Sequence, residues 1–305
     1  MPDKVQEKRT AWRSGKRGIQ KAVLFVIVLL FASSFALPIV LTMTNSFMKE
    51  EEVVMDYGNV YGTYEEAAGG YVSKEVNLKF IPDKVSLRQY ETVLLLSPEY
   101  LLKFWNSVIL SVPIVAFQIV VSLGAAYSFT RFRSRRREGV FFLYTLLMMM
   151  PFQVSLVPNY LVAARLGILN TYWAIILPGI FSTFSTFLLT KFMRRIPVSV
   201  IEAARLDGAG EWSIFTKICV PLCKNAMVSV AMLLFIDYWN MVEQPLIMLS
   251  DKEAYPLSVY LSTINTGEIS LAFAVAVLYM IPTILVILYG EDYLVDGISC
   301  YGGIR

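Results

Sequence analysis

The sequence predicts an all-α integral membrane protein with six transmembrane helices. Of its 305 residues, 56% are hydrophobic and only 17% are charged, whereas soluble domains carry about 25% charged residues. The apolar residues gather in runs of about 20, the length that a helix needs to cross a bilayer. Helices are the expected form because they pair their own backbone groups where water is absent.

Six apolar runs meet this length requirement. The first follows a basic segment, as in a secretory signal peptide, but it is longer than the usual h-region of about 7–15 residues. We therefore expect an uncleaved membrane anchor there. The six expected spans are Ala22–Thr42, Phe104–Phe129, Val140–Ala163, Tyr172–Phe192, Leu222–Leu249 and Leu271–Tyr289.

Positive charge predicts the orientation of these spans. Lys and Arg are concentrated in residues 1–21, 131–137 and 191–217, whereas the intervening connections are acidic or sparsely charged. Short loops rich in Lys and Arg stay in the cytoplasm, so both termini are expected there. The run Arg135–Arg137 is expected to anchor lipid headgroups rather than to bind nucleic acid.

These spans divide the chain into predicted regions. The long insert 43–103 contains Tyr57-Gly58, Tyr61-Gly62 and Gly69-Gly70-Tyr71, which predict irregular structure. The regions are a cytoplasmic basic tail 1–21, a first span 22–42, an extracytoplasmic insert 43–103, a core 104–290 that includes a cytoplasmic loop 193–221, and a cytoplasmic tail 291–305.

Composition excludes several kinds of chemistry. The chain has no histidine, so it lacks the commonest acid–base group near neutral pH and any Ser/His or Cys/His pair. Its three cysteines, Cys219, Cys223 and Cys300, show no metal-ligand spacing and are expected to be packing residues. No Gly-x-x-x-x-Gly-Lys loop is present, so we expect no ATP hydrolysis by this chain and no enzyme activity.

The polar loop between the fourth and fifth spans has signals for two short helices. Ser199 followed by Glu202 predicts a capping box, with a helix that runs through Leu206. Asp207-Gly208 predicts a turn in which glycine adopts a positive φ. Glu211 is expected to open a second helix.

The second helix is expected to reach the membrane surface at Pro221, with Trp212, Phe215 and Ile218 at helical spacing. Small residues at Ala203-Ala204 and Gly208 let another surface approach closely. The loop is therefore predicted to be a compact docking element.

This loop resembles the cytoplasmic signature of importer-type ABC permeases, in which Glu-Ala-Ala is followed by Gly, Ile and a Leu-Pro pair. The matching residues, in register, are Glu202, Ala203, Ala204, Gly208, Ile218 and Pro221. Val220 replaces the leucine, and Asn225 stands where many relatives have a proline.

The resemblance covers nearly the whole chain except the insert 45–103, and it favours the sugar-importing branch that includes the MalG-like subunit of maltose importers. The Gly-containing tail 297–305 is similar to that of this subunit. The other matching segments are Asn106-Ser107, Ala126-Tyr127, Pro158-Asn159-Tyr160, residues 166–171, Ile176-Leu177-Pro178 and Trp239-Asn240.

The resemblance implies the type I ABC importer permease fold with a cytoplasmic coupling helix. It also implies a MalF-like second permease, two ATP-binding subunits and an extracytoplasmic solute-binding protein as partners. ATP would be bound by the partner ATPases, with no cofactor or metal in this chain. The residues implied in ATPase coupling are Glu202, Ala203, Ala204, Asp207 and Gly208.

Polar residues inside the spans are candidates for the solute pathway. Asp237 lies within the fifth expected span, and a charge there is costly unless it faces a cavity or a partner. A position near the outer headgroups is the alternative for Asp237, and Glu243 is expected at the interface. The pathway candidates are Gln118, Gln153, Asn159, Asp237 and Asn240.

Two other functions remain open from the sequence. An ABC importer for amino acids, peptides or anions would differ only in its binding residues. An ion-coupled secondary transporter would often show several intramembrane carboxylates, and only one lies deep in this chain. Such a transporter has no need of the Glu-Ala-Ala loop.

Overall fold

The computed structural model describes residues 3–57, 79–132, 134–263 and 269–302, and leaves the side chains of residues 3–19, Val54 and 295–302 undescribed. The prediction of irregular structure at Gly58, Tyr61-Gly62 and Gly69–Tyr71 therefore falls outside the described residues. So do the side chain of Cys300 and the end of the glycine-containing tail.

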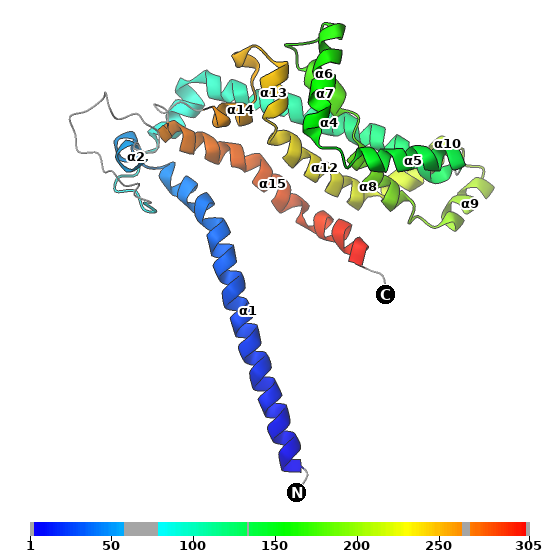
Figure 1. Cartoon of the computed structure of the whole chain (residues 1–305), viewed down its shortest axis with the longest axis horizontal. Helices are drawn as coiled ribbons and strands as arrows, with labels where there is room; N and C mark the ends of the chain where they lie inside the picture. Colours follow the sequence, from blue (N-terminus) through cyan, green and yellow to red (C-terminus); the bar gives the residue numbers. More distant parts are fainter. Residues whose placement is uncertain (1–2, 58–78, 133, 264–268, 303–305) are drawn as a thin grey trace. The chain divides into compact units, whose positions relative to one another are not determined.

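The described residues form helices and no β-sheet, which confirms the all-α prediction. They belong to two compact units, Met1–Glu91 with Asn265–Val277 and Thr92–Ile264 with Leu278–Arg305. Figure 1 shows the helices in chain order.

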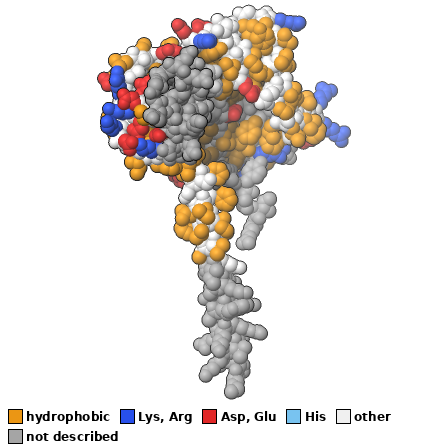
Figure 2. All heavy atoms as spheres, turned by 60° about the vertical axis from the view of Figure 1, so that its left-hand side comes forward, with side chains coloured by type: hydrophobic (Ala, Val, Ile, Leu, Met, Phe, Trp, Pro, Cys, Tyr) orange, Lys and Arg blue, Asp and Glu red, His pale blue; other side chains and the backbone are white. Residues whose placement is uncertain are grey.

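The first unit contains α1 (Asp3–Asn45), α2 (Glu50–Tyr57), α3 (Arg88–Glu91) and the start of α15 (Ile269–Gly302). Val23, Leu24 and Phe25 of α1 are each more than half exposed, and Figure 2 shows hydrophobic atoms on its surface. Exposed apolar side chains at this density fit a helix that lies in lipid.

The described ends of the insert pack against the ends of the neighbouring helices. Met48, Val53 and Tyr57 form a buried apolar cluster with Ile269. Lys79 Nζ lies 2.8 Å from Glu52 Oε1, which also accepts the Asp83 N–H at 2.8 Å. These contacts tie the two ends of the insert together.

The second unit is built around the long helix α4 (Pro98–Arg131), which packs against α8 and α12. The other elements are η2 (Thr92–Leu96), α5 (Arg135–Leu147), α6 (Phe152–Leu166), α7 (Trp173–Gly179), α8 (Thr183–Met193), α9 (Val198–Leu206), α10 (Glu211–Ile214), η3 (Phe215–Cys219), α11 (Val220–Leu222), α12 (Lys224–Trp239), α13 (Glu243–Met248), η4 (Lys252–Ala254), α14 (Leu257–Ser262) and the rest of α15.

Among the described residues, four helical segments are long and apolar enough to cross a membrane, and the number rises to six if each of two bent helix pairs is one span. The four segments are Gln20–Asn45, Pro98–Arg131, Trp173–Met193 and Ile269–Leu294. They coincide with the first, second, fourth and sixth predicted spans. Helix α15 continues to Gly302, beyond the predicted end of the sixth span.

The third predicted span is not the continuous helix that its composition suggests. Helices α5 and α6 meet at a bend of 105°. Pro151 stands at the N-cap of α6, where its missing N–H and fixed φ stop a helix that arrives from the N-terminal side.

The fifth predicted span, Leu222–Leu249, is likewise interrupted. Helix α12 ends at Trp239, and α13 begins only at Glu243. At its other end, α12 forms a bend of 72° with the segment Glu211–Leu222. Polar residues stand at both boundaries, Asn240 and Glu243 at the first and Lys224 and Asn225 at the second.

Candidate functional sites: an exposed turn and a polar cavity

Helix α9 spans Val198–Leu206, so it ends at the predicted residue but starts earlier than predicted. The prediction that Ser199 is the N-cap of a capping box is wrong, since Pro197 occupies the N-cap and makes no side-chain cap bond. The fixed φ of proline already suits a helix start. Ser199 therefore lies inside the helix, and Glu202 is left exposed.

The turn after α9 has the predicted glycine geometry. Gly208 has a φ of 81°, its N–H donates to Arg205 O, and the Ala209 N–H donates to Ala204 O, both at 3.0 Å. This pair of bonds is a Schellman motif, which pairs carbonyls at the end of a helix. The turn therefore leaves the end of α9 with a defined shape.

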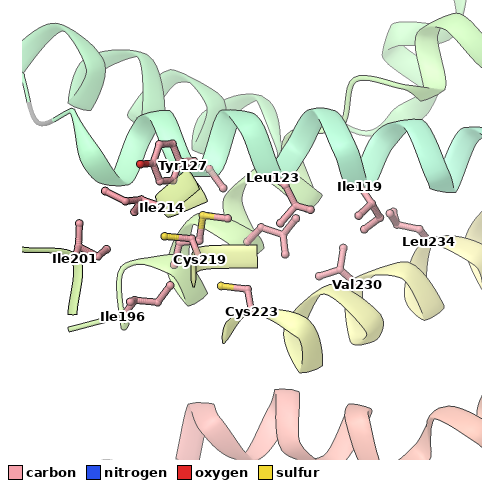
Figure 3. Close-up of a cluster of buried hydrophobic side chains, with 13 residues drawn as sticks. Ile119, Leu123, Tyr127, Ile196, Ile201, Ile214, Cys219, Cys223, Val230 and Leu234 are labelled. Carbon is pink, nitrogen blue, oxygen red and sulfur yellow. The ribbon is translucent and has the colours of Figure 1, made fainter. Parts of the chain in front are cut away.

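One face of α9 is buried and the other is open. Ile201 is 1% exposed and packs in an apolar cluster with Ile196, Ile214 and Cys219, whose side chains lie near one another in Figure 3. Ala204 also packs against this cluster, so only the first alanine of the pair lies on the open face.

The open face of α9 is a candidate docking surface. Leu206 on this face is 89% exposed, which is unusual for a leucine with a buried cluster close by. We define the docking face by its exposed residues, which are Glu202, Ala203, Leu206, Asp207 and Gly208.

Glu211 connects α9 to the membrane helix α4. Its carboxylate accepts from the Arg205 guanidinium at 2.6 Å and from the Tyr127 hydroxyl at 2.5 Å. The Tyr127 bond is the largest reason that the pKa of Glu211 lies below its ordinary value; partial burial opposes this shift, whereas Arg205 and Arg131 add to it. In the sequence, Glu211 is recognisable only as the start of a helix.

The second helix of the loop begins at Glu211 as predicted, but a π-helical turn, η3, interrupts it. Such turns insert an extra residue and often occur at functional sites. Trp212 remains 75% exposed beside the docking face. Cys219 and Cys223 are buried free thiols, as expected of packing residues.

A polar cavity of about 420 Å³ lies where α12 ends and α13 begins. Three of the predicted pathway residues, Gln153, Asp237 and Asn240, line it together. The other lining residues are Phe152, Tyr238, Met241, Val242, Glu243 and Gln244. Gln153 comes from α6, so the cavity joins two segments that are distant in sequence.

Hydrogen bonds hold part of the cavity wall. Asn240 Oδ1 accepts from the Tyr279 hydroxyl at 2.8 Å, and Asn240 Nδ2 donates to Ile236 O at 2.7 Å. Gln153 Nε2 donates to Glu243 Oε1 at 3.4 Å. Glu243 thus faces the cavity, a position that its sequence context did not reveal, because the break in the helix at Asn240 turns it inward.

The remaining two pathway candidates do not line this cavity. Gln118 is fully buried between α4 and α8, where its amide donates to Ser185 Oγ at 2.7 Å. Asn159 lies in α6, partly exposed and outside the cavity lining. Gln118 joins two helices, which a polar residue in an apolar span can also do.

Two of the segments that resemble the importer permeases, Asn106-Ser107 and residues 166–171, bond to the connection between α13 and α14. Asn170, with a φ of 61°, accepts the N–H groups of Ser250 and Asp251 at 2.8 Å and 3.0 Å. Asn106 donates to Glu253 O at 2.7 Å. Backbone groups of an otherwise irregular connection are thereby paired.

The described residues contain no group of three or more Cys, Asp or Glu side chains arranged to hold a metal ion. The candidate sites are therefore a helical docking face and a polar cavity in a helical protein.

Comparison with known proteins agrees with this architecture. The pattern of the family described as "Binding-protein-dependent transport system inner membrane component" matches residues 118–299. The arabinooligosaccharides transport system permease protein AraQ of Halalkalibacterium halodurans is 27% identical over 233 residues, 75% of this chain and 83% of that protein. The lactose transport system permease protein LacG of Rhizobium radiobacter is 32% identical over 199 residues, 64% of this chain and 73% of that protein.

A solved structure shares the fold. It is a crystal structure of a bacterial ABC transporter involved in the import of the acidic polysaccharide alginate, with a TM-score of 0.74 and 22% identity, covering 90% of this chain and 96% of that chain. Together with the family match, this fold supports the type I importer architecture. The chain therefore belongs to the family of binding-protein-dependent transport system inner membrane components, and it is a membrane-embedded transport permease of an ABC importer that works with a solute-binding protein, not an enzyme.

Proposed function

We propose that this permease imports an uncharged saccharide or oligosaccharide. The observation that carries the proposal is the lining of the cavity between α6 and α12. It combines the amides of Gln153, Asn240 and Gln244 with the rings of Phe152 and Tyr238. Amides both donate to and accept from hydroxyl groups, and a few polar groups among apolar walls are typical of a small-molecule site.

The charge of the cavity supports an uncharged solute over an anionic one. Asp237 and Glu243 line it, and its described lining contains no Lys or Arg. Two carboxylates near a carboxylated or phosphorylated solute would repel it. AraQ and LacG are named for arabinooligosaccharides and lactose, which carry no charge, whereas the relative UgpE of Brucella abortus, 30% identical over 199 residues, is named for sn-glycerol-3-phosphate, and alginate is acidic. The lining of the cavity, and not the names of the relatives, therefore carries the proposal.

Uptake by cells that express the complete transporter tests the solute class. The panel is labelled lactose, an arabino-oligosaccharide and an oligomer of alginate. We expect ATP-dependent accumulation of one of the uncharged sugars, and a large loss of that uptake in Asp237→Lys and Gln153→Ala. Accumulation of the alginate oligomer alone would overturn the proposal.

The docking face of α9 is proposed to bind an ATPase subunit. Its exposed Leu206 and the small residues Ala203 and Gly208 offer a close-fitting contact, supported from beneath by the buried Ile201. In this proposal two such ATPases bind ATP, and a second permease completes the pathway. Closure of the ATPases moves α9, which changes the equilibrium between inward-open and outward-open states.

Co-purification from membranes tests the docking face. An ATPase is expected to accompany the wild-type chain and to be lost with Gly208→Asp. Gly139→Asp is the matched control, because it adds the same side chain at another exposed glycine with open space around it. Equal retention of the ATPase by both variants would exclude docking at Gly208. An ion-driven uptake by the chain alone would favour the secondary transporter instead.

The two termini and the docking face are proposed to lie in the cytoplasm. The basic segments 1–21, 131–137 and 191–217 support this orientation. Thiol labelling in intact cells checks it: a cysteine at exposed Arg136, outside the docking face, should react only with a membrane-permeant reagent, and one at exposed Asp251 should react with an impermeant reagent.

A further inference from the structure

The carboxylate of Glu211 lies between two helices and bonds to both. On the α9 side, Oε1 accepts from Arg205 Nε at 3.1 Å and from its terminal nitrogen at 2.6 Å. On the α4 side, Oε2 accepts from the Tyr127 hydroxyl at 2.5 Å, and the same hydroxyl lies 3.3 Å from the Glu211 carbonyl oxygen. One side chain thus spans the gap between the docking element and a membrane helix.

The α4 end of this bridge is firmly held. Tyr127 is 8% exposed and belongs to the buried apolar cluster. Figure 3 labels it among the side chains of this cluster. Its ring lies 5.1 Å from that of Phe215 and 6.5 Å from that of Phe132. A tyrosine packed on both sides keeps its hydroxyl in one place.

The α9 end is open to solvent. The side chains of Arg205 and Glu211 are 49% and 43% exposed, and an ion pair in such a place adds little to stability. The role of this ion pair is therefore better explained by the orientation that it imposes on α9 than by the stability that it adds. The bonds of a charged hydrogen-bonded network restrict angle and distance.

Apolar packing alone restricts α9 less. The helix has nine residues, and among them Ile201 is its one buried residue. Ala204 is only partly buried against the same cluster. Hydrophobic contacts are not directional, so a short helix that rests on these two side chains can rotate or slide. The Arg205–Glu211–Tyr127 bridge removes this freedom.

We infer that Glu211 is a positioning residue that fixes docking helix α9 to membrane helix α4, so that the two move as one body when the ATPases close. The inference rests on the proposed docking of α9 to an ATPase, and goes beyond it by assigning the transmission of movement to one carboxylate. Glu211 need not touch the ATPase or the solute.

A distance measurement in the complete transporter tests this role. Nitroxide labels are placed on Ser199→Cys of α9 and Val121→Cys of α4, both exposed positions, in a parent whose own cysteines are replaced by alanine. Distances are measured by pulsed electron paramagnetic resonance in lipid nanodiscs, without nucleotide and after trapping with ATP and vanadate. ATPase co-purification is recorded for every sample.

In the parent, we expect one narrow distance distribution that is the same in both states. Glu211→Gln and Tyr127→Phe should retain the ATPase but shift and broaden the distribution on trapping. Tyr127→Phe keeps the packed ring and loses only the hydroxyl. Glu138→Gln, the same substitution at an exposed position of α5, should behave as the parent.

Three results would overturn the inference. The first is a distribution in both variants that is as narrow and unshifted as in the parent, which would mean that packing alone holds α9. The second is a parent distribution that itself changes on trapping. The third is a parent that brings down no ATPase, which contradicts the docking proposal as well and is thereby distinguished from the other two.

Discussion

Replacement of Gly208 by alanine isolates the backbone strain of the docking turn. A Cβ added at this position would meet no atom within 4 Å, and the obstacle is the φ of +81°. The left-handed conformation costs a residue with a Cβ about 1–2 kcal/mol. Gly210 is the matched control, because it also has open space around it but a φ of −71°.

The pair of variants separates strain from chain entropy. Both replacements reduce the freedom of the unfolded chain by a similar amount. The difference between their free energies of unfolding therefore reports the strain in the folded turn. If the alanine turn leaves the left-handed conformation when free and must return to it to dock, Gly208→Ala should bind the ATPase up to about 5- to 30-fold more weakly than Gly210→Ala, which corresponds to 1–2 kcal/mol.

The assay is a titration of purified ATPase onto the permease in nanodiscs, with Gly208→Asn as a third variant. Asparagine tolerates the left-handed region better than alanine, so its affinity should fall between those of the other two. Equal affinities for Gly208→Ala and Gly210→Ala would refute the reasoning, since the turn conformation would then not matter for docking.

Ile201→Ala should destabilise the protein by about 2–5 kcal/mol because it empties a buried site, whereas Leu206→Ala, at an 89% exposed position, should leave thermal unfolding in detergent nearly unchanged and weaken ATPase binding. The pKa of Glu211 is lowered in the folded protein, so its small stabilising effect should be complete above the unfolded pKa of about 4.3 and should be lost as the pH falls through the lower folded value. Other carboxylates, such as Glu52, also have a lowered pKa, so a pH series of thermal unfolding should show a loss in both proteins that is slightly larger in the wild type than in Glu211→Gln. Asn170→Gly keeps the left-handed backbone but loses two accepted hydrogen bonds, which should lower stability by about 0.5–1.5 kcal/mol each, and Asn170→Ala should lower it further because alanine adds backbone strain. Hydrogen exchange of the Ser250 and Asp251 amides should become faster in both variants and fastest in Asn170→Ala; equal rates in the two would contradict the strain.

Local sequence signals in the docking loop predict some of its features and fail for others. The positive φ of Gly208 and the second helix start at Glu211 are confirmed, because each depends on residues that are adjacent in sequence. The capping role of Ser199 is wrong, since Pro197 starts the helix instead. The bridge from Glu211 to Tyr127 joins residues that are 84 positions apart, and no local pattern could indicate it.

The residues around the cavity, too, could be predicted only in part from local sequence. Polarity within apolar runs suggested Gln153, Asp237 and Asn240 as pathway residues, and the structure places these three around one space. Polarity also suggested Gln118, which instead bonds to Ser185 between two helices. A buried amide in a span can satisfy itself on a neighbouring helix or face a cavity, and only the neighbours decide.

The sequence by itself determined the membrane-helical class, the long apolar segments and the motif that places the chain in its family, because these depend on composition and on residues close together in the chain. The tertiary structure decided where the third and fifth spans break, which face of α9 is open, and that Glu211 joins α9 to α4. Each of these is set by contacts between distant segments, whose directional bonds and close packing leave no periodic trace in the sequence.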